Sequence, residues 1–271
     1  MLDPSGIPSR QTRLARLPGL VDQFAGRMEN RLIRAVPRAV MQVPTQEPIV
    51  SFTFDDVPAS ALDVGAAILE AHGARGTFYI AGGLEGHVEP GRTLIDRAGC
   101  RELAGRGHEL GCHSFSHHDL RHVDGDALAR DLARNAAYLD AIDPRAVRRN
   151  FAYPYNSGSF GKRALLGDAF RSCRAAGEGI NRGPTDPAFL RAVEIRQPQH
   201  HVLGLPRWID ALVADPGWLI FFTHDVSPQP TPHGCTPPSF HLLVAYAVAR
   251  GCQILTVDAA LDRMGLREAR P

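Results

Sequence analysis

The sequence lacks long apolar runs, a strong excess of charge of either sign, and any closely spaced pair of cysteines. A membrane-spanning helix needs about 20 consecutive apolar residues, and no segment of this 271-residue chain is of that kind. Lys and Arg number 30 and Asp and Glu number 29, so the composition lacks the basic excess typical of nucleic-acid-binding proteins. We therefore expect a globular protein with no membrane span and no nucleic-acid partner.

The cysteines are few and scattered, five in all between Cys100 and Cys252. An odd count without a Cys-x-x-Cys pair argues against a cysteine zinc site or redox motif, and it predicts reduced, mostly buried thiols. The N-terminus is rich in arginine and proline and lacks the apolar core of a secretory signal. Together these features predict a cytoplasmic protein.

Residues 1–47 differ from the rest of the chain and predict an N-terminal extension with one amphipathic helix. In it Leu20, Phe24, Met28 and Leu32 recur every four residues, which is the spacing of one helical face. We expect this helix to pack on the outside of the main domain. A contact between two copies of the chain, giving a homodimer, and a basic helix on a membrane surface are the alternatives.

From residue 48 to residue 271, short apolar strands alternate with helices. The predicted strands are 49–54, 77–80, 108–112, 150–153, 190–195, 218–222 and 253–257. Alternation of this kind predicts parallel β-strands, and seven or eight units in sequence favour a closed α/β barrel over an open sheet. No glycine-rich phosphate-binding pattern follows the first strand, which argues against a nucleotide-binding fold. In a barrel the chemistry lies at the C-terminal ends of the strands.

Two adjacent carboxylates, Asp55 and Asp56, follow the first predicted strand. Two such charges repel each other unless a positive group lies beside them. In a functional site one carboxylate would bind a metal ion and the other would remain as a base. A turn or a helix cap is the alternative, which accounts for one carboxylate more readily than for two.

A His-x-x-x-His pair, His113 and His117, follows the third predicted strand. A spacing of four places two imidazoles on one face of a helical turn, where one cation reaches both, whereas His118 points off that face. Two histidines and a carboxylate form a triad with open positions for water and substrate. A cluster of surface histidines is the alternative.

His224 follows the strand at 218–222 and therefore belongs at the same edge of the barrel. We expect it to act as a general acid; a structural histidine is the alternative. The loop after it, at 227–239, holds five prolines and is long for a barrel. It is either a binding loop, in which His233 and Cys235 face the substrate, or a rigid connector.

Taken together, these segments resemble the polysaccharide deacetylase family, also called carbohydrate esterase family 4 or the NodB-homology domain. The resemblance covers about residues 48–260. The matching segments are 53–56, 113–117, 151–155 in part, and Phe222 with His224. Val57 stands where the family usually has glycine.

The resemblance implies a distorted (β/α) barrel of seven or eight strands that removes N-acetyl groups from amino sugars, a hydrolase of C–N bonds other than peptide bonds. It makes Asp56, His113 and His117 the ligands of a divalent metal. Zn2+ is the metal that we expect first, with Co2+, Ni2+, Fe2+ and Mn2+ as alternatives. The implied substrate is an N-acetylated sugar or glycan, and the cytoplasmic location favours a glycan precursor.

The resemblance also makes Asp55 the general base and His224 the general acid, with the backbone N–H of Tyr155 helping to hold the oxyanion. The family usually carries an arginine that pairs with the base, and the matching position here is Ala152. A base near a metal benefits from a cation that fixes its rotamer. We expect Arg196, at the C-terminal end of the strand predicted near 190–196, to take that place.

Two other functions stay open. Relatives of this barrel hydrolyse other C–N bonds, such as those of cyclic amides. The missing arginine would also fit a carbohydrate-binding protein that has lost catalysis, whereas the retained aspartates and histidines oppose it. The family's acidic residue and tryptophan have no clear match here, and 208–210 is only a loose candidate.

Overall fold

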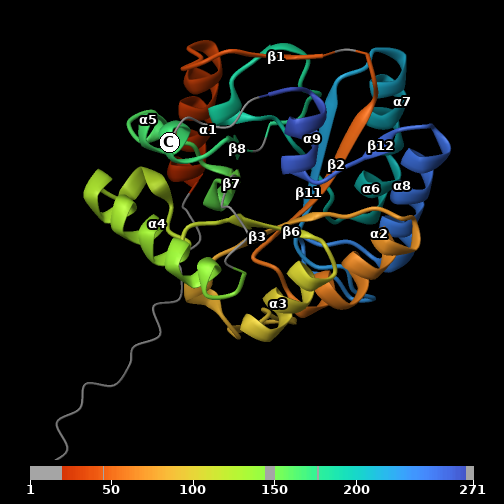
Figure 1. Cartoon of the computed structure of the whole chain (residues 1–271), viewed down its shortest axis with the longest axis horizontal. Helices are drawn as coiled ribbons and strands as arrows, with labels where there is room; N and C mark the ends of the chain where they lie inside the picture. Colours follow the sequence, from red (N-terminus) through yellow and green to blue (C-terminus); the bar gives the residue numbers. More distant parts are fainter. Residues whose placement is uncertain (1–19, 45, 144–149, 176, 267–271) are drawn as a thin grey trace, which may run out of the picture.

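The computed structural model describes residues 20–266 except 45, 144–149 and 176. Its centre is a sheet of parallel strands that curls into a distorted barrel, with helices on the outside (Figure 1). The strands of this sheet are β2 (Ile49–Asp55), β3 (Thr77–Ile80), β6 (Glu109–Cys112), β7 (Asn150–Ala152), β8 (Ser172–Arg174), β10 (Val193–Glu194), β11 (Trp218–Thr223) and β12 (Gln253–Ile254). The predicted barrel is confirmed.

Helices connect most of these strands. They are α1 (Leu20–Ala35), α2 (Ala67–Ala71) after the π-helix η1 (Ala61–Ala66), α3 (Arg97–Gly105), α4 (Gly125–Asp140), α5 (Arg163–Ala169), α6 (Gln199–Leu203), α7 (Pro206–Ala214), α8 (Pro237–Ala249) and α9 (Val257–Arg263). Within the described ranges, none of them has the length and apolarity that crossing a bilayer requires.

The strand order is β10–β11–β2–β3–β6–β7–β8, and β12 pairs with the start of β2. Hydrogen bonds at Leu190 close the barrel beyond β8: its N–H donates to Cys173 at 2.8 Å, and its carbonyl accepts from the N–H of Ala175 at 3.0 Å. Because all these strands are parallel, their C-terminal ends meet at one edge of the barrel.

The central strands β2 and β11 are buried along their whole length, as expected for strands covered on both faces. Phe52 stacks on Phe221 with ring centroids 5.5 Å apart, and Phe54 stacks on Phe78 at 4.5 Å. Phe240 of α8 meets both Phe52 and Phe54 edge-on. Each such pair contributes about 0.5–1.5 kcal/mol beyond simple burial, so the two strands have a rigid base.

Some boundaries differ from the sequence prediction. The stretch before α3 holds a hairpin of β4 (Val88–Glu89) and β5 (Arg92–Thr93), which the predicted strands do not include, and α3 starts after it at Arg97. Asp96 caps α3 by accepting the N–H of Gly99 at 3.0 Å, which fixes the start. The short strand β8 and the helix α9 were not predicted, nor was the pairing of β1 (Met41–Val43) with β9 (Gly183–Thr185).

Helix α1 forms where the periodicity predicts it, but its apolar stripe faces outward. Phe24 is 66% exposed, and Met28 and Leu32 are about half exposed at 47% and 52%. The opposite face packs on the barrel: Ile33 is buried, and Asn30 exchanges two hydrogen bonds with the loop after β7, at 3.0 and 2.9 Å. That loop offers backbone polar groups, which Asn30 satisfies and an apolar stripe would not. The domain division at residue 47 stays a prediction.

Candidate active site

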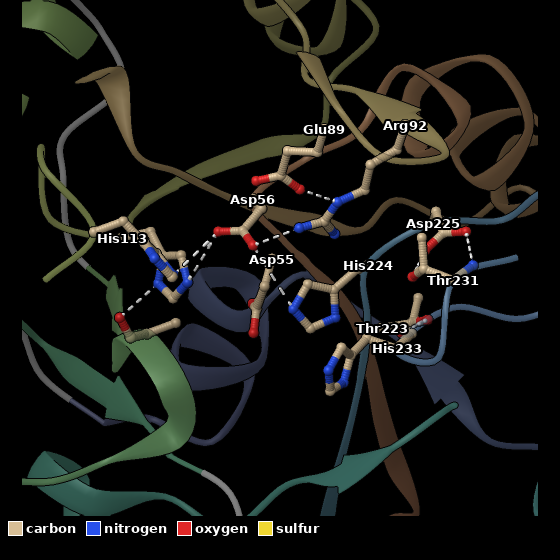
Figure 2. A network of polar contacts seen from close by, with 12 residues as sticks. Asp55, Asp56, Glu89, Arg92, His113, Thr223, His224, Asp225, Thr231 and His233 are labelled. Atoms are coloured by element: carbon tan, nitrogen blue, oxygen red, sulfur yellow. Dashed lines mark hydrogen bonds and ion pairs between the residues drawn. The ribbon is translucent and has the colours of Figure 1, made fainter. Parts of the chain in front are cut away.

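Most of the predicted site residues gather at the C-terminal edge of the barrel, where Figure 2 shows Asp55, Asp56, His113 and His224 close together. Asp55 is the last residue of β2, and Asp56 begins the turn after it. His113 follows β6, and His224 follows β11. The loops after three different strands therefore contribute side chains to one site.

Asp56, His113 and His117 form a compact cluster. The Nε2 of His117 lies 3.2 Å and that of His113 lies 3.7 Å from Oδ1 of Asp56. The three ligand atoms lie within 4.8 Å of one another, a span that a single cation bridges. Oδ1 of Asp56 is buried and accepts no hydrogen bond among the described residues. A buried carboxylate oxygen without a donor, beside two imidazoles, fits a metal ligand.

His113 is prepared for metal binding by its second ring nitrogen. Its Nδ1 lies 2.8 Å from the carbonyl oxygen of Ala152. Because a carbonyl only accepts, Nδ1 carries the proton, and Nε2 keeps its lone pair on the side of Asp56. Burial lowers the pKa of His113 to about 4, so the ring is neutral at pH 7. A neutral, oriented imidazole is the form that binds a metal.

The helical turn predicted for 113–117 is absent. Ser114 and His117 have φ values of +58° and +50°, which no α-helix contains. Asp131 of α4 holds this loop by accepting the N–H of Phe115 at 2.7 Å and of Ser116 at 3.1 Å. The rings at 113 and 117 still converge, with centroids 4.9 Å apart. The loop, held in place by α4, thus brings the two imidazoles together, which the helical turn was expected to do.

Arg92 of the β4–β5 hairpin is a site residue that sequence reasoning missed. Its Nη2 lies 3.2 Å from Oδ2 of Asp56, and its Nε lies 2.5 Å from Oε2 of Glu89 (Figure 2). Burial by itself raises the pKa of Asp56, but the three nearby histidines and Arg92 together bring it below its usual range. Asp56 is therefore ionised at neutral pH, as a metal ligand must be.

Asp55 is paired with Arg174, the last residue of β8. Nη2 of Arg174 lies 2.7 Å from Oδ1 and 2.5 Å from Oδ2 of Asp55, and both side chains are buried. Nη1 donates to Oδ1 of Asn156 at 3.1 Å. The guanidinium lies 4.6 Å from the ring centroid of Phe222 and 5.3 Å from that of Tyr79. These contacts fix the guanidinium, and the guanidinium holds the carboxylate in one rotamer.

The expectation that Arg196 pairs with Asp55 is wrong. Nε of Arg196 lies 3.3 Å from Oε2 of Glu194, and Nη1 donates to the carbonyl of Gln197 at 2.9 Å. Strand β10 ends at Glu194, so the side-chain alternation that favoured Arg196 does not extend to it. Arg174 is instead the register partner of Ala152 on the neighbouring strand. The arginine beside Asp55 thus comes from the strand next to the one on which the resembling family carries it, at the same level of the barrel.

His224 lies across the site from His113, with its Nε2 3.9 Å from Oδ2 of Asp56. Burial lowers the pKa of His224, although the negative charges of Asp56 and Asp55 act to raise it. The loosely matched segment 208–210 lies in α7, where Asp210 accepts the hydroxyl of Tyr246 at 2.7 Å and pairs with Arg250. Asp210 therefore does not orient His224.

Left-handed backbone is concentrated in the loops of this site. Every non-glycine residue with positive φ in the described part of the chain lies there: Asp56, Val57, Ser114, His117, Tyr155 and Asn156. Val57, at φ +47°, is β-branched and poorly suited to this region, and it stands where the resembling family has glycine. Backbone strain of this kind persists where the surroundings hold it, typically at functional sites.

Tyr155 lies at the rim of the site, on the loop after β7. Its side chain is 38% exposed, and its ring centroid is 4.7 Å from that of His117. The role expected of its backbone N–H stays a prediction. The side chain adds an aromatic surface beside the metal cluster, which the resemblance did not assign.

The loop after β11 is pinned by Asp225, whose carboxylate accepts the N–H of Thr231 at 2.8 Å and its hydroxyl at 2.5 Å. Cys235 is buried, and burial raises its thiol pKa to about 12, so it does not face a substrate. His233 does lie beside the site, with its ring centroid 5.3 Å from that of His224. All five cysteines are buried and none forms a disulfide in the structure, as the cysteine pattern predicts.

Known proteins match this fold and these motifs. The polysaccharide deacetylase family matches residues 42–168. The chitin deacetylase of Colletotrichum lindemuthianum is 28% identical over 208 residues, which are 72% of this chain and 77% of that protein. Both matches are to the family that the motifs resemble, so the comparisons confirm that resemblance.

Solved structures agree on the fold. The Xyl-CE4 domain of a multidomain xylanase from the hindgut metagenome of Trinervitermes trinervoides has a TM-score of 0.58 at 16% identity, over 83% of this chain and 95% of that one. A family 4 acetyl xylan esterase from Clostridium thermocellum, in complex with a cobalt ion, has a TM-score of 0.56 at 19% identity, over 81% and 93%.

Proposed function

We propose that this chain is a metal-dependent hydrolase that removes the N-acetyl group of an amino sugar in a glycan or a glycan precursor. The observation that carries the proposal is the contrast between two adjacent carboxylates. Asp56 faces two imidazoles with a free buried oxygen, whereas Asp55 is held by Arg174. The chitin deacetylase relative supports a carbohydrate substrate, and the cobalt ion of the esterase supports a divalent metal.

In this proposal Asp56, His113 and His117 hold the metal, and this donor set of two nitrogens and one oxygen favours Zn2+. When bound, the metal supplies Lewis-acid polarisation of the acyl oxygen and lowers the pKa of water. Asp55 takes the proton of the attacking water. Arg174 is a positioning residue, because it fixes the rotamer in which Asp55 faces the site.

His224 donates a proton to the departing nitrogen, since its Nε2 faces the cluster from the other side of Asp56. The backbone N–H of Tyr155 donates a hydrogen bond to the oxyanion. The cytoplasmic location and the oligomeric state stay predictions.

The test is acetate release from N-acetylglucosamine oligomers by protein stripped of metal and reloaded with Zn2+ or Co2+. Release should depend on the added metal and be lost in Asp55→Asn. The matched control is Asp63→Asn, which changes an exposed carboxylate on η1 and should leave release unaltered. Protein that binds metal but releases no acetate from any oligomer would contradict the proposed activity.

A further inference from the structure

A second group of metal-ligand side chains lies at the same edge of the barrel. Glu194 ends β10. His224 follows β11, and His233 comes from the loop after it (Figure 2). We propose that these three side chains form a second cation site for a transition-metal ion such as Zn2+, and that a cation bound there inhibits hydrolysis.

The geometry of the three side chains suits one cation. Glu194, His224 and His233 each offer one ligand atom, and these atoms lie within 4.8 Å of one another. Nδ1 of His233 is 3.1 Å from Oε1 of Glu194. One carboxylate oxygen and two imidazole nitrogens are a donor set that Zn2+ takes in tetrahedral sites, with a fourth position left for water.

His224 has a ring nitrogen available for this second site. Its Nε2 lies on the side of Asp56, at 3.9 Å from Oδ2. Its Nδ1 is buried and has no hydrogen-bond partner among the described residues. Buried ring nitrogens are normally satisfied, so this one indicates a place for a ligand that the protein itself does not supply.

The segment that carries His233 is held in place before any cation binds. The backbone carbonyl of His233 accepts the N–H of His224 at 3.2 Å. Gly234 follows it with no room for a side chain, because a Cβ there would lie 2.4 Å from Oδ1 of Asp225. A ligand fixed in this way loses little conformational freedom when it binds, which favours affinity.

Arg196 limits how tightly this site binds a cation. Its Nε lies 3.3 Å from Oε2 of Glu194, whereas Oε1 faces His233. A cation therefore has Oε1 to bind without displacing Arg196. The guanidinium nonetheless repels a second positive charge so close by, and neutralising Arg196 should strengthen the site.

Filling the site changes what His224 can do. A cation on Nδ1 occupies the lone pair that would otherwise accept a proton, so the doubly protonated imidazolium cannot form. Only a neutral Nε2–H is left, which is a much weaker acid. This inhibitory part rests on the proposed role of His224 as general acid, whereas cation binding itself does not.

The stoichiometry of Zn2+ decides whether the site exists. The full chain, without a polyhistidine tag, is titrated with Zn2+ against a chromophoric chelator, and bound metal is counted. Wild type should bind two ions, the second more weakly. His233→Ala should weaken only the second, by about 100-fold or more, since even outer-shell changes cost about 10–100-fold. Arg196→Gln should tighten the second ion.

The exposed His122 provides a matched control, because His122→Ala also removes one imidazole and should still bind two ions. A wild-type chain that binds one ion would overturn the site. So would a His233→Ala chain that binds two ions with unaltered affinities.

Activity decides the inhibitory part. Within each variant, acetate release with ten equivalents of Zn2+ is divided by release with one equivalent. In wild type this ratio should be about one tenth or lower, because a general acid contributes about 10²–10⁴-fold. In His233→Ala it should stay near unity. Two bound ions without inhibition would overturn this part. No release at one equivalent would count against the proposed function, and the stoichiometry would still decide the site.

Discussion

The two sides of the barrel mouth relate differently to the family's motifs. On the side of β2 and β6, the cluster of Asp56, His113 and His117 lies where the motifs place it. On the side of β7, β8 and β10, Ala152 occupies the position of the expected arginine, and Arg174 on the next strand supplies the guanidinium. A metal ligand must reach its ion at about 2.0–2.2 Å, whereas a long arginine reaches a carboxylate from several strands. The ligands on the first side can therefore come from few positions in the chain, whereas the arginine on the second side can come from several.

The largest expected effect is on turnover and comes from changing Asp55, which ends β2 on the first side and pairs with Arg174 on the second. Asp55→Asn keeps the shape of the side chain and removes the base, so turnover should fall by about 10²–10⁴-fold. Bound metal, counted in the same sample, should change little because the cluster of Asp56 is untouched. Turnover within a few-fold of wild type would place the base elsewhere.

The second effect concerns the relocated arginine. Arg174→Met leaves Asp55 buried without its partner, which should lower the free energy of unfolding by about 3–5 kcal/mol. Urea unfolding measures this loss. Asp55→Asn should recover much of it in the double variant, because the unpaired charge is then gone.

The same pair of variants tests whether Arg174 acts on catalysis through Asp55. Arg174→Met should lower turnover in the wild-type background and lower it little further in the Asp55→Asn background. Equal losses in both backgrounds would mean that Arg174 has a general structural role and does not position the base.

The third effect tests the side that follows the motifs. His117→Ala removes a direct ligand, so metal affinity should fall by about 100-fold or more, and most activity should go with it. His118→Ala removes the exposed neighbouring imidazole and should keep both. Competition against a chelator gives the two affinities. Full metal retention in His117→Ala would contradict the ligand assignment.

The smallest effect is on the stability of the metal-free protein against pH. Burial lowers the pKa of His113 from 6.5 to about 4, so between these values the unfolded chain binds a proton that the folded chain does not. Stability should therefore fall as the pH drops from 6.5 to 4, by roughly 3 kcal/mol from this group. Burial of His224 acts in the same direction.

The measurement is urea unfolding of chelator-treated protein across that range. His113→Asn should flatten the dependence by removing its share. An unaltered slope in His113→Asn would show that His113 does not carry this proton.

The chain pattern predicts much of the barrel because its buried parallel strands are short, mostly apolar runs between helices, as in β2 and β11. It predicts that Asp56, His113 and His117 come together, because a cation site demands particular residue types in a particular order. It does not predict Arg174, since β8 has only three residues and shows no alternation. Only the register of β8 with β7 indicates that Arg174 lies level with Ala152.

Other site residues escape for similar reasons. Arg92 lies in a hairpin that was not predicted. His233 was expected at the site only if its loop is a binding loop, and its place depends on how Asp225 holds that loop. The outward stripe of α1 escapes because amphipathic patterns assume that the apolar face packs inward. For Arg174 and for α1 the deciding contacts are more than 100 residues away in the sequence, so the local pattern cannot contain them.

The place of Arg174 bears on how active members of such a family are recognised. A genome survey that demands arginine in the alignment column of Ala152 would discard this chain as a degenerate homologue. A three-dimensional query for a guanidinium within hydrogen-bonding distance of the first aspartate would retain it. A survey by column would therefore miss chains in which the guanidinium beside this aspartate comes from the adjacent strand.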